Sequence, residues 1–193
     1  MCIRDRLTPL GAFNLNLPLP GRHNIMNALA AVSAAIALSI DFSDIAAGLA
    51  SLRMVKGRLT TRPGLNGSTI LDDSYNANPA SLLAGLEVLA ACGGRRMLVL
   101  GDMGELGEDA RELHRRAGEQ AREMGIDAVY TTGRMSQAAS EAFGENGHFY
   151  ESQQQLIEAL LPRMNGELTV LVKGSRSSRM ERVVEALSAE GEM

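Results

Sequence analysis

The chain has 193 residues, enough for one complete domain and part of a second. Its net charge of -4, with both signs interspersed, argues against a basic nucleic-acid-binding surface, and its hydrophobic content of 45% excludes a disordered chain. Cys2 and Cys92 show neither a metal-binding spacing nor a disulfide framework, and no apolar stretch is long enough to span a bilayer. We therefore expect a cytoplasmic α/β protein.

The first predicted elements lie in residues 1–53. Residues 1–10 share no periodicity with the sequence that follows and are left out of the predicted fold. Residues 13–20 alternate as a half-buried strand does, and their two prolines make this an edge strand or a strand end. One helix is predicted at about 24–39, and a second follows Asp41, with Ser43 as N-cap, and runs to about residue 52. One strand and two helices cannot close a core, so we expect the tail of a larger domain.

From residue 54 to the end, strands and helices alternate, which predicts a Rossmann-like α/β domain. Its mostly parallel six-stranded sheet should carry helices on both faces. The first two strands are separated only by Leu65-Asn66-Gly67, and this predicts an antiparallel hairpin at one edge. The expected strands are 59–62, 69–73, 97–101, 128–131, 148–150 and 168–173, and the expected helices are 80–91, 110–124, 135–143, 153–161 and 178–187.

The segment Leu71–Pro79 (LDDSYNANP) concentrates polar side chains where a predicted strand leads into a helix. Ligands usually bind beyond the carboxyl ends of the strands in α/β proteins. A capped turn would account for Asp72, Ser74 and Asn78, which can satisfy backbone amides. One cap needs one such residue and the segment offers five or six, so we favour a binding role.

Lysine usage marks two further segments, because the chain has only Lys56 and Lys173 among its 19 basic residues. Each stands beside a glycine at an element boundary. Lys173-Gly174-Ser175-Arg176 follows a strand and enters a helix, and its amides, hydroxyl and cations would suit an anion. The alternative is an ordinary serine-capped helix with solvated charges.

Two other patterns are less specific. Asn24 and Asn27 share a face near a predicted helix start beside His23; capping explains one asparagine, whereas the amide of Asn27 could read a base edge or serve no ligand. The segment 101–107 (GDMGELG) lacks the dinucleotide pattern G-x-G-x-x-G and predicts a ligand-facing loop with Asp102 and Glu105 at its tip.

Several enzyme classes leave no trace in the sequence. It contains no G-x-x-x-x-G-K-[ST] phosphate loop, no H-E-x-x-H zinc motif and no G-x-S-x-G elbow.

Five segments in this order and spacing resemble the C-terminal part of the Mur ligases: PGRHNIMNALAA, MVKGRL, DDSYNANP, LGDMGELG and LVKGSRSSRME. The resemblance covers residues 11–193. DDSYNANP and VKGSRS are most similar to the branch of the family that adds D-alanyl-D-alanine. It implies that residues 1–53 end the central ATP-binding domain and that residues 54–193 form the C-terminal Rossmann-like domain.

The resemblance also implies the reaction. These ligases use ATP and Mg²⁺ to activate the carboxylate of UDP-N-acetylmuramoyl-tripeptide as an acyl phosphate, which the amine of D-alanyl-D-alanine attacks to build a peptidoglycan precursor. The phosphate loop and the magnesium ligands are expected in the part of the central domain that this sequence lacks. The chain by itself should be an inactive monomer without a catalytic residue or metal ligand of its own.

Residue roles follow from the same resemblance. His23, Asn24 and Asn27 match the adenine side, Arg58 matches an arginine that reaches ATP, and Asp73 matches the carboxylate that holds the ribose hydroxyls. Asn76 and Asn78 are expected to face the peptide. The carboxylates of the dipeptide or tripeptide are assigned to Lys173, Ser175 and Arg176, with Asp102 as a weaker candidate for the same surface.

Two rival interpretations remain open. The chain could be a non-catalytic module that binds a nucleotide or peptide. It could also come from another ligase of the Mur or folylpolyglutamate synthase type, which shares the fold but should lack DDSYNANP.

Overall fold

The computed structural model describes residues 2–8, 11–19, 22–53 and 55–189, which form two compact units, Met1–Val55 and Lys56–Met193. None of the helices within these described ranges is long and apolar enough to cross a membrane.

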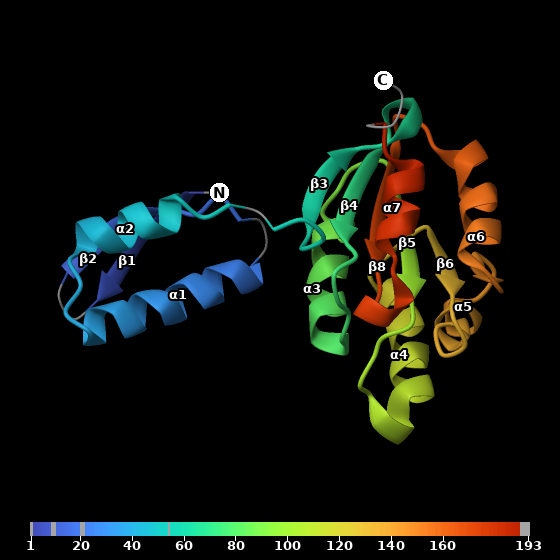
Figure 1. The fold of residues 1–193 in the computed structure, drawn as a ribbon, viewed down its shortest axis with the longest axis horizontal. Helices are drawn as coiled ribbons and strands as arrows, with labels where there is room; N and C mark the ends of the chain where they lie inside the picture. The colour runs from blue at the N-terminus through green and yellow to red at the C-terminus, as the bar shows by residue number, and fades with distance from the viewer. Residues whose placement is uncertain (1, 9–10, 20–21, 54, 190–193) are drawn as a thin grey trace. The chain divides into compact units, whose positions relative to one another are not determined.

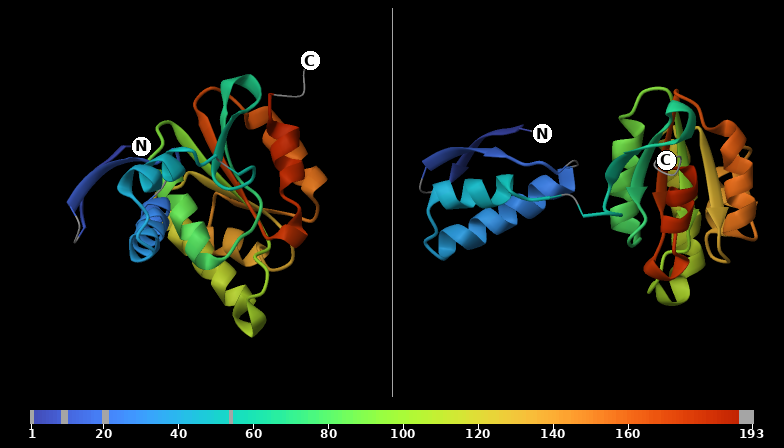
Figure 2. Two further views of the ribbon diagram at one scale, coloured as in Figure 1. Left: turned by 60° about the vertical axis from the view of Figure 1, so that its left-hand side comes forward. Right: turned by 45° about the horizontal axis from the view of Figure 1, so that its top comes forward.

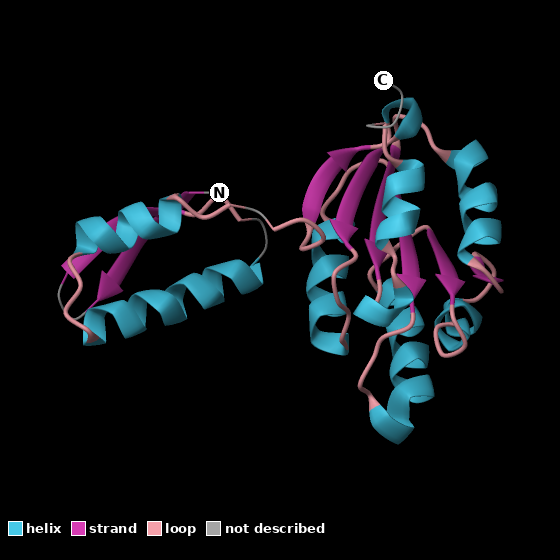
Figure 3. Cartoon of the chain, in the orientation of Figure 1, coloured by secondary structure: helices cyan, strands magenta, loops and turns pink. Residues whose placement is uncertain are grey.

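Within its described residues, the first unit contains two strands and two helices (Figure 3). Strands β1 (Cys2–Thr8) and β2 (Gly11–Asn16) pair antiparallel, and helices α1 (Arg22–Ala37) and α2 (Phe42–Ala50) follow. Omitting residues 1–10 from the fold therefore missed a strand. Its register shifts between Ile3 and Arg6, and such a bulge breaks the two-residue alternation by which a strand is recognised in a sequence.

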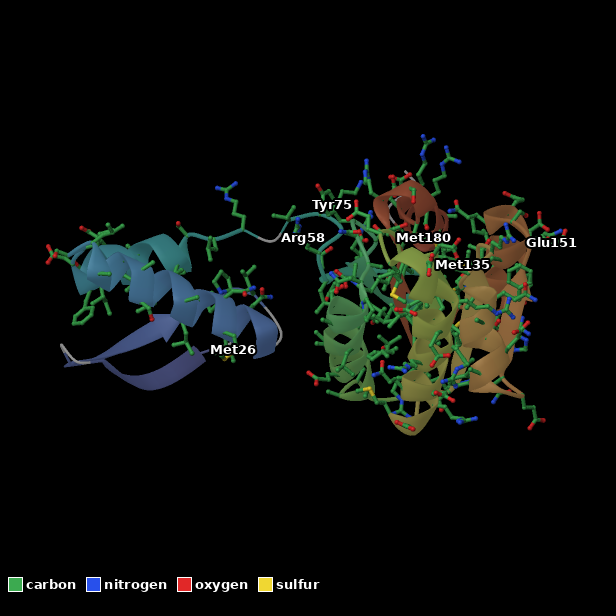
Figure 4. All side chains as sticks on the ribbon, turned by 90° about the horizontal axis from the view of Figure 1, so that it is seen from below. Met26, Arg58, Tyr75, Met135, Glu151 and Met180 are labelled. Atoms are coloured by element: carbon green, nitrogen blue, oxygen red, sulfur yellow. The ribbon has the colours of Figure 1, made fainter. Side chains whose placement is uncertain are left out.

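The described core of this unit is small. Leu17 and Ala28 are buried, and Leu19, Ile25 and Leu49 pack against them. Large apolar side chains nevertheless face solvent, including Met26 on α1, which is labelled in Figure 4 and is 60% exposed, and Leu38, which is 75% exposed. Asp41 rather than Ser43 occupies the N-cap position of α2, and its side chain makes no capping hydrogen bond.

The second unit is built on a six-stranded sheet with the order β3-β4-β8-β5-β6-β7 (Figure 1). The predicted hairpin is confirmed, since β3 and β4 pair antiparallel, and every other neighbouring pair is parallel. The sheet is therefore the mostly parallel six-stranded sheet expected from the alternation of elements. The strands are β3 (Thr60–Pro63), β4 (Thr69–Asp73), β5 (Arg95–Gly101), β6 (Ala128–Thr132), β7 (Gly147–Tyr150) and β8 (Leu168–Lys173).

Helices cover both faces of this sheet (Figures 1 and 2). One face packs against α3 (Pro79–Ala90), α4 (Ala110–Glu123) and α5 (Gln137–Phe143), and the other against α6 (Gln153–Leu160) and α7 (Glu181–Leu187). Consecutive strand residues alternate between the two cores: Leu98 and Leu100 join the first, whereas Met97 and Val99 join the second. A strand buried on both faces reads as a continuous apolar run, which is why the sequence locates these strands well.

Two helices begin later than the sequence predicts. Helix α5 begins at Gln137 instead of residue 135, and α7 begins at Glu181 instead of residue 178. A short 3-10 turn at Arg176–Ser178 precedes α7, and Arg179 after it has a left-handed φ of 49°. A single left-handed residue ends a helical turn, so the regular helix starts only beyond it.

Gly118 supplies a test of the packing of α4 on α5. A Cβ at this position would overlap the carbonyl of Ala139, whereas a Cβ at Gly93 meets nothing within 4 Å. We predict that Gly118→Ala lowers the free energy of unfolding by about 1–3 kcal/mol, because overpacking against backbone outweighs the gain in helix propensity. Gly93→Ala is the control. Urea unfolding followed by circular dichroism measures both, and equal midpoints would contradict the tight contact.

Candidate functional site

A buried ion pair lies at the carboxyl edge of the parallel sheet. Asp73 ends β4 and Lys173 ends β8, and the two residues are register partners on adjacent strands. The Lys173 ammonium donates hydrogen bonds to the Asp73 carboxylate and, at 2.9 Å, to the carbonyl of Asn76. The side chain of Lys173 is 1% exposed and that of Asp73 is 14% exposed.

Burial and charge act in opposite directions on Lys173. Desolvation lowers the pKa of its ammonium below the ordinary value, and the charge and hydrogen bond of Asp73 counteract this only in part. The nearby guanidinium of Arg58 lowers the pKa further. Lys173 is therefore an internal counter-ion of Asp73 in this structure, although the sequence pattern suggests an exposed cation at a loop.

Asp73 also fixes the segment that carries Arg58. Its carboxylate accepts a hydrogen bond of 3.0 Å from the backbone N–H of Leu59. Leu59 has a left-handed φ of 52°, a conformation that costs a non-glycine residue energy and persists where surrounding contacts enforce it. The N–H of Tyr75 donates to the carbonyl of Gly57 at 2.9 Å, so the segment is attached to DDSYNANP at two points.

Two guanidinium groups approach the exposed ring of Tyr75. Arg58 lies 4.7 Å from the ring centroid and Arg176 lies 5.8 Å from it, both within cation–π range. Figure 4 shows Arg58 beside Tyr75. Tyr75 is 44% exposed and was missed as a site residue, although it is the one aromatic side chain in the polar segment 72–78. Tyr75 and the guanidinium groups of Arg58 and Arg176 therefore lie together at the surface.

Part of the polar segment serves the local fold. The Asp72 carboxylate is buried and accepts hydrogen bonds from the N–H and hydroxyl of Ser74, at 3.2 and 2.6 Å. Asn78 caps α3 by accepting from the N–H of Ser81 at 2.9 Å in a capping box. Asn76 is exposed, and its side-chain oxygen accepts from the N–H of Ala77. The capped-turn interpretation therefore explains three of the polar residues, while Tyr75 and Asn76 face outward.

The segment after β8 is folded back on itself. Ser175 is 4% exposed, and its hydroxyl lies 2.9 Å from that of Ser177 and 3.1 Å from that of Ser178. Arg176 is exposed and pairs with Glu181 at 3.2 Å. Of the predicted anion-binding residues, only Arg176 presents its charge to solvent.

Asp102 at the end of β5 lies close to this segment. Its carboxylate accepts from the N–H groups of Met135 and Ser136 at 3.0 and 2.7 Å. A polar pocket of about 360 Å³ opens beside it, and Thr132, Glu151 and Ser177 also line this pocket. The structure thus brings Asp102 to the same edge as Ser175 and Arg176, with its carboxylate engaged by backbone.

The predicted adenine-side residues belong to the first unit. Asn24 is partly buried and Asn27 is exposed, and both lie on α1. The side chain of His23 lies outside the described residues. Among the residues that the structure describes, no group of three or more His, Cys, Asp or Glu could hold a metal ion.

The chain is similar to a known protein family and to individual proteins of known activity. A family model described as "Mur ligase, glutamate ligase domain" matches residues 57–176. The UDP-N-acetylmuramoyl-tripeptide–D-alanyl-D-alanine ligase of Escherichia coli is 45% identical over 185 residues, which cover 95% of this chain and 41% of that protein. The ligase of the same name from Haemophilus influenzae is 36% identical over 187 residues, covering 94% and 40%. The chain therefore spans about two fifths of the length of these relatives.

Solved structures show the same similarity to D-alanyl-D-alanine-adding ligases as the sequence comparison. A crystal structure of MurF from Acinetobacter baumannii matches with a TM-score of 0.83 and 34% identity, over 94% of this chain and 40% of that one. The MurF ligase from Thermotoga maritima in complex with ADP matches with a TM-score of 0.74 and 29% identity, over 91% and 40%.

The two lysines of the chain form a matched pair for testing the site. We predict that Lys173→Met lowers the free energy of unfolding by about 3–5 kcal/mol, because it leaves the largely buried Asp73 carboxylate without its counter-ion. Lys56→Met should cost less than about 1 kcal/mol, since its 3.5 Å pair with Glu185 is exposed. The double variant Asp73→Asn/Lys173→Met should recover much of the loss. Chemical denaturation measures all three, and similar losses for both lysines would contradict the assignment.

Proposed function

Because the chain belongs to the Mur ligase family, we propose that it is the C-terminal part of an ATP-dependent ligase of peptidoglycan synthesis. Its substrates would be UDP-N-acetylmuramoyl-tripeptide and D-alanyl-D-alanine. The observation that carries the proposal is the 45% identity, over 95% of this chain, to the Escherichia coli ligase of that name.

The chemistry of such a ligase requires placement and charge neutralisation. A carboxylate attacks the γ-phosphorus of ATP and releases ADP, forming an acyl phosphate. The amine of the dipeptide attacks the acyl carbon, and the tetrahedral intermediate expels phosphate as it collapses to the amide. Each step develops negative charge on oxygens that fixed cations and hydrogen-bond donors stabilise. The residues of this chain would supply binding groups and no nucleophile.

For the nucleotide, we assign Arg58 and Asp73. The Arg58 guanidinium is exposed and held against Tyr75, where it can donate to phosphate or ribose oxygens. Asp73 is held by Lys173 and Leu59, so its carboxylate is positioned to accept from ribose hydroxyls. His23, Asn24 and Asn27 of the first unit remain proposed for the adenine. The ADP complex of the Thermotoga maritima relative supports nucleotide binding in general.

For the peptide substrates, we assign four side chains at the same edge of the sheet, of which Ser175 is buried and the other three are exposed. Asn76 and Asn78 offer amide groups, and Ser175 and Arg176 lie on the segment after β8. Arg176 suits a substrate carboxylate because its guanidinium is exposed and forks two donors toward a planar anion. Lys173 would act indirectly, by holding the Asp73 carboxylate in place.

The proposal extends to location and metal use. A cytoplasmic monomer fits an enzyme that consumes ATP and a nucleotide-linked precursor. The described residues offer no cluster for Mg²⁺, so no step is assigned to a metal held by this chain.

The test is a chimera in which residues 11–193 replace the matching part of the Escherichia coli ligase. We predict D-alanyl-D-alanine-dependent phosphate release from ATP by this chimera. Arg58→Gln should raise the KM for ATP by about 10-fold or more, because it removes charge-assisted hydrogen bonds.

The control is Arg122→Gln, which removes an exposed arginine on α4 and should leave kinetics unchanged. A folded chimera without ligation would contradict the proposed function. An unchanged KM for ATP in Arg58→Gln would remove Arg58 from the nucleotide site.

A further inference from the structure

Two glycine-containing loops at the carboxyl edge of the sheet are locked together. We call residues 101–107 the β5 loop and residues 174–180 the β8 loop. The carbonyl of Asp102 accepts from the N–H of Ser175 at 2.8 Å and from the hydroxyl of Ser178 at 2.9 Å. These hydrogen bonds join residues more than 70 positions apart in the sequence.

Three glycines of these loops, Gly101, Gly104 and Gly174, are explained by this contact. A Cβ at Gly101 would lie 2.8 Å from the sulfur of Met180, and a Cβ at Gly174 would lie 2.5 Å from the Cγ of the same residue. A Cβ at Gly104 would lie 3.3 Å from the Cβ of Ser175. The absence of side chains at these glycines lets the two loops approach each other, and Met180 fills the space between them.

A buried histidine on α4 also holds the β5 loop. His114 on α4 is 0% exposed, and its Nε2 lies 2.9 Å from the backbone N–H of Met103. Because a backbone N–H can only donate, Nε2 must accept and carries no proton. Nδ1 then bears the proton and donates to the carbonyl of Ala110 at 2.6 Å. The ring is thus neutral in this state, and two backbone groups select its tautomer.

The carboxylate of Asp102 completes the attachment. It accepts from the N–H groups of Met135 and Ser136, immediately before α5. Residues 101–103 are therefore fixed by α4, by the segment before α5 and by the β8 loop. The hydrogen bonds of the Asp102 carboxylate therefore indicate a structural role and not a ligand-binding role.

We propose that the β5 loop is a positioning device for the β8 loop and that His114 is its anchoring residue. Through the N–H of Met103 and the carbonyl of Asp102, His114 sets the placement of Ser175 and, with it, of Arg176. The substrate consequence rests on the proposed function, which assigns these two residues to the peptide substrates; here we take the carboxylate of the dipeptide as their ligand. The mechanical relay between the loops does not depend on that assignment.

Two substitutions of His114 distinguish its hydrogen bond to the β5 loop from its packing in the core. His114→Gln keeps an acceptor at a similar reach from the helix, whereas His114→Met keeps the length of the side chain and removes the acceptor. In the 193-residue chain, His114→Met should accelerate amide hydrogen exchange about 10-fold or more at Met103 and at Ser175. The amide of Val129 in β6 should change little, and His114→Gln should stay near the wild type.

Ser178→Ala probes the relay from its other end without touching the core. It removes the hydroxyl that donates to the Asp102 carbonyl, so exchange should accelerate at Ser175 and not at Met103. This variant keeps the test decisive if His114→Met does not fold. Unchanged exchange at Ser175 in either folded variant would overturn the relay.

Kinetics of the chimera test the consequence for the substrate. His114→Met should raise the KM for D-alanyl-D-alanine about 10-fold while the KM for ATP stays within about twofold, and His114→Gln should restore the dipeptide KM. A parallel rise of both KM values would indicate general loosening and would overturn the positioning role. Failure of the proposed function would show instead as a wild-type chimera without ligation, with the exchange results intact.

Discussion

The buried pair of Asp73 and Lys173 determines the geometry of the carboxyl edge of the sheet. It joins register partners on β4 and β8, and its two members also bind the N–H of Leu59 and the carbonyl of Asn76. Three segments distant in sequence thus depend on a single contact. Such a pair adds little net stability compared with apolar residues, because desolvation offsets the attraction, whereas loss of one partner is costly. Its value here is geometric: the residues around Arg58, Tyr75 and Lys173 cannot move independently.

Charged groups at this edge divide into those that support and those that are presented. Lys173 and Asp72 are buried and make hydrogen bonds to protein groups, whereas Arg58 and Arg176 are exposed and both lie near the ring of Tyr75. A buried cation orients its neighbours, and an exposed guanidinium can still exchange water for a phosphate or carboxylate. The same division holds in the polar segment, where Asp72 and Asn78 stabilise the turn and the helix start while Tyr75 and Asn76 face solvent.

Much of the fold was predictable because its signals are local. Strands β4 and β8 have the predicted limits, since residues buried on both faces read as continuous apolar runs, and the short Leu65–Gly67 connection revealed the hairpin. The missed strand β1 contains a bulge that hides its alternation. The site was only partly predictable, because the burial of Lys173 and the contact of Tyr75 with Arg176 join segments about 100 residues apart. A lysine beside a glycine looks the same in sequence whether its ammonium meets water or a buried carboxylate.

The glycines of segment 101–107 show how far a motif can be interpreted without a structure. Glycine at the end of a strand indicates that something approaches the backbone closely, and in dinucleotide-binding folds that partner is a pyrophosphate. At Gly101 and Gly104 the approaching group is the β8 loop, with Met180 beside the first and Ser175 beside the second. The departure from G-x-G-x-x-G is therefore consistent with a different task. These glycines allow the backbones of two loops of the same protein to pack closely. The buried His114 holds one of these loops in place by accepting a hydrogen bond from the N–H of Met103.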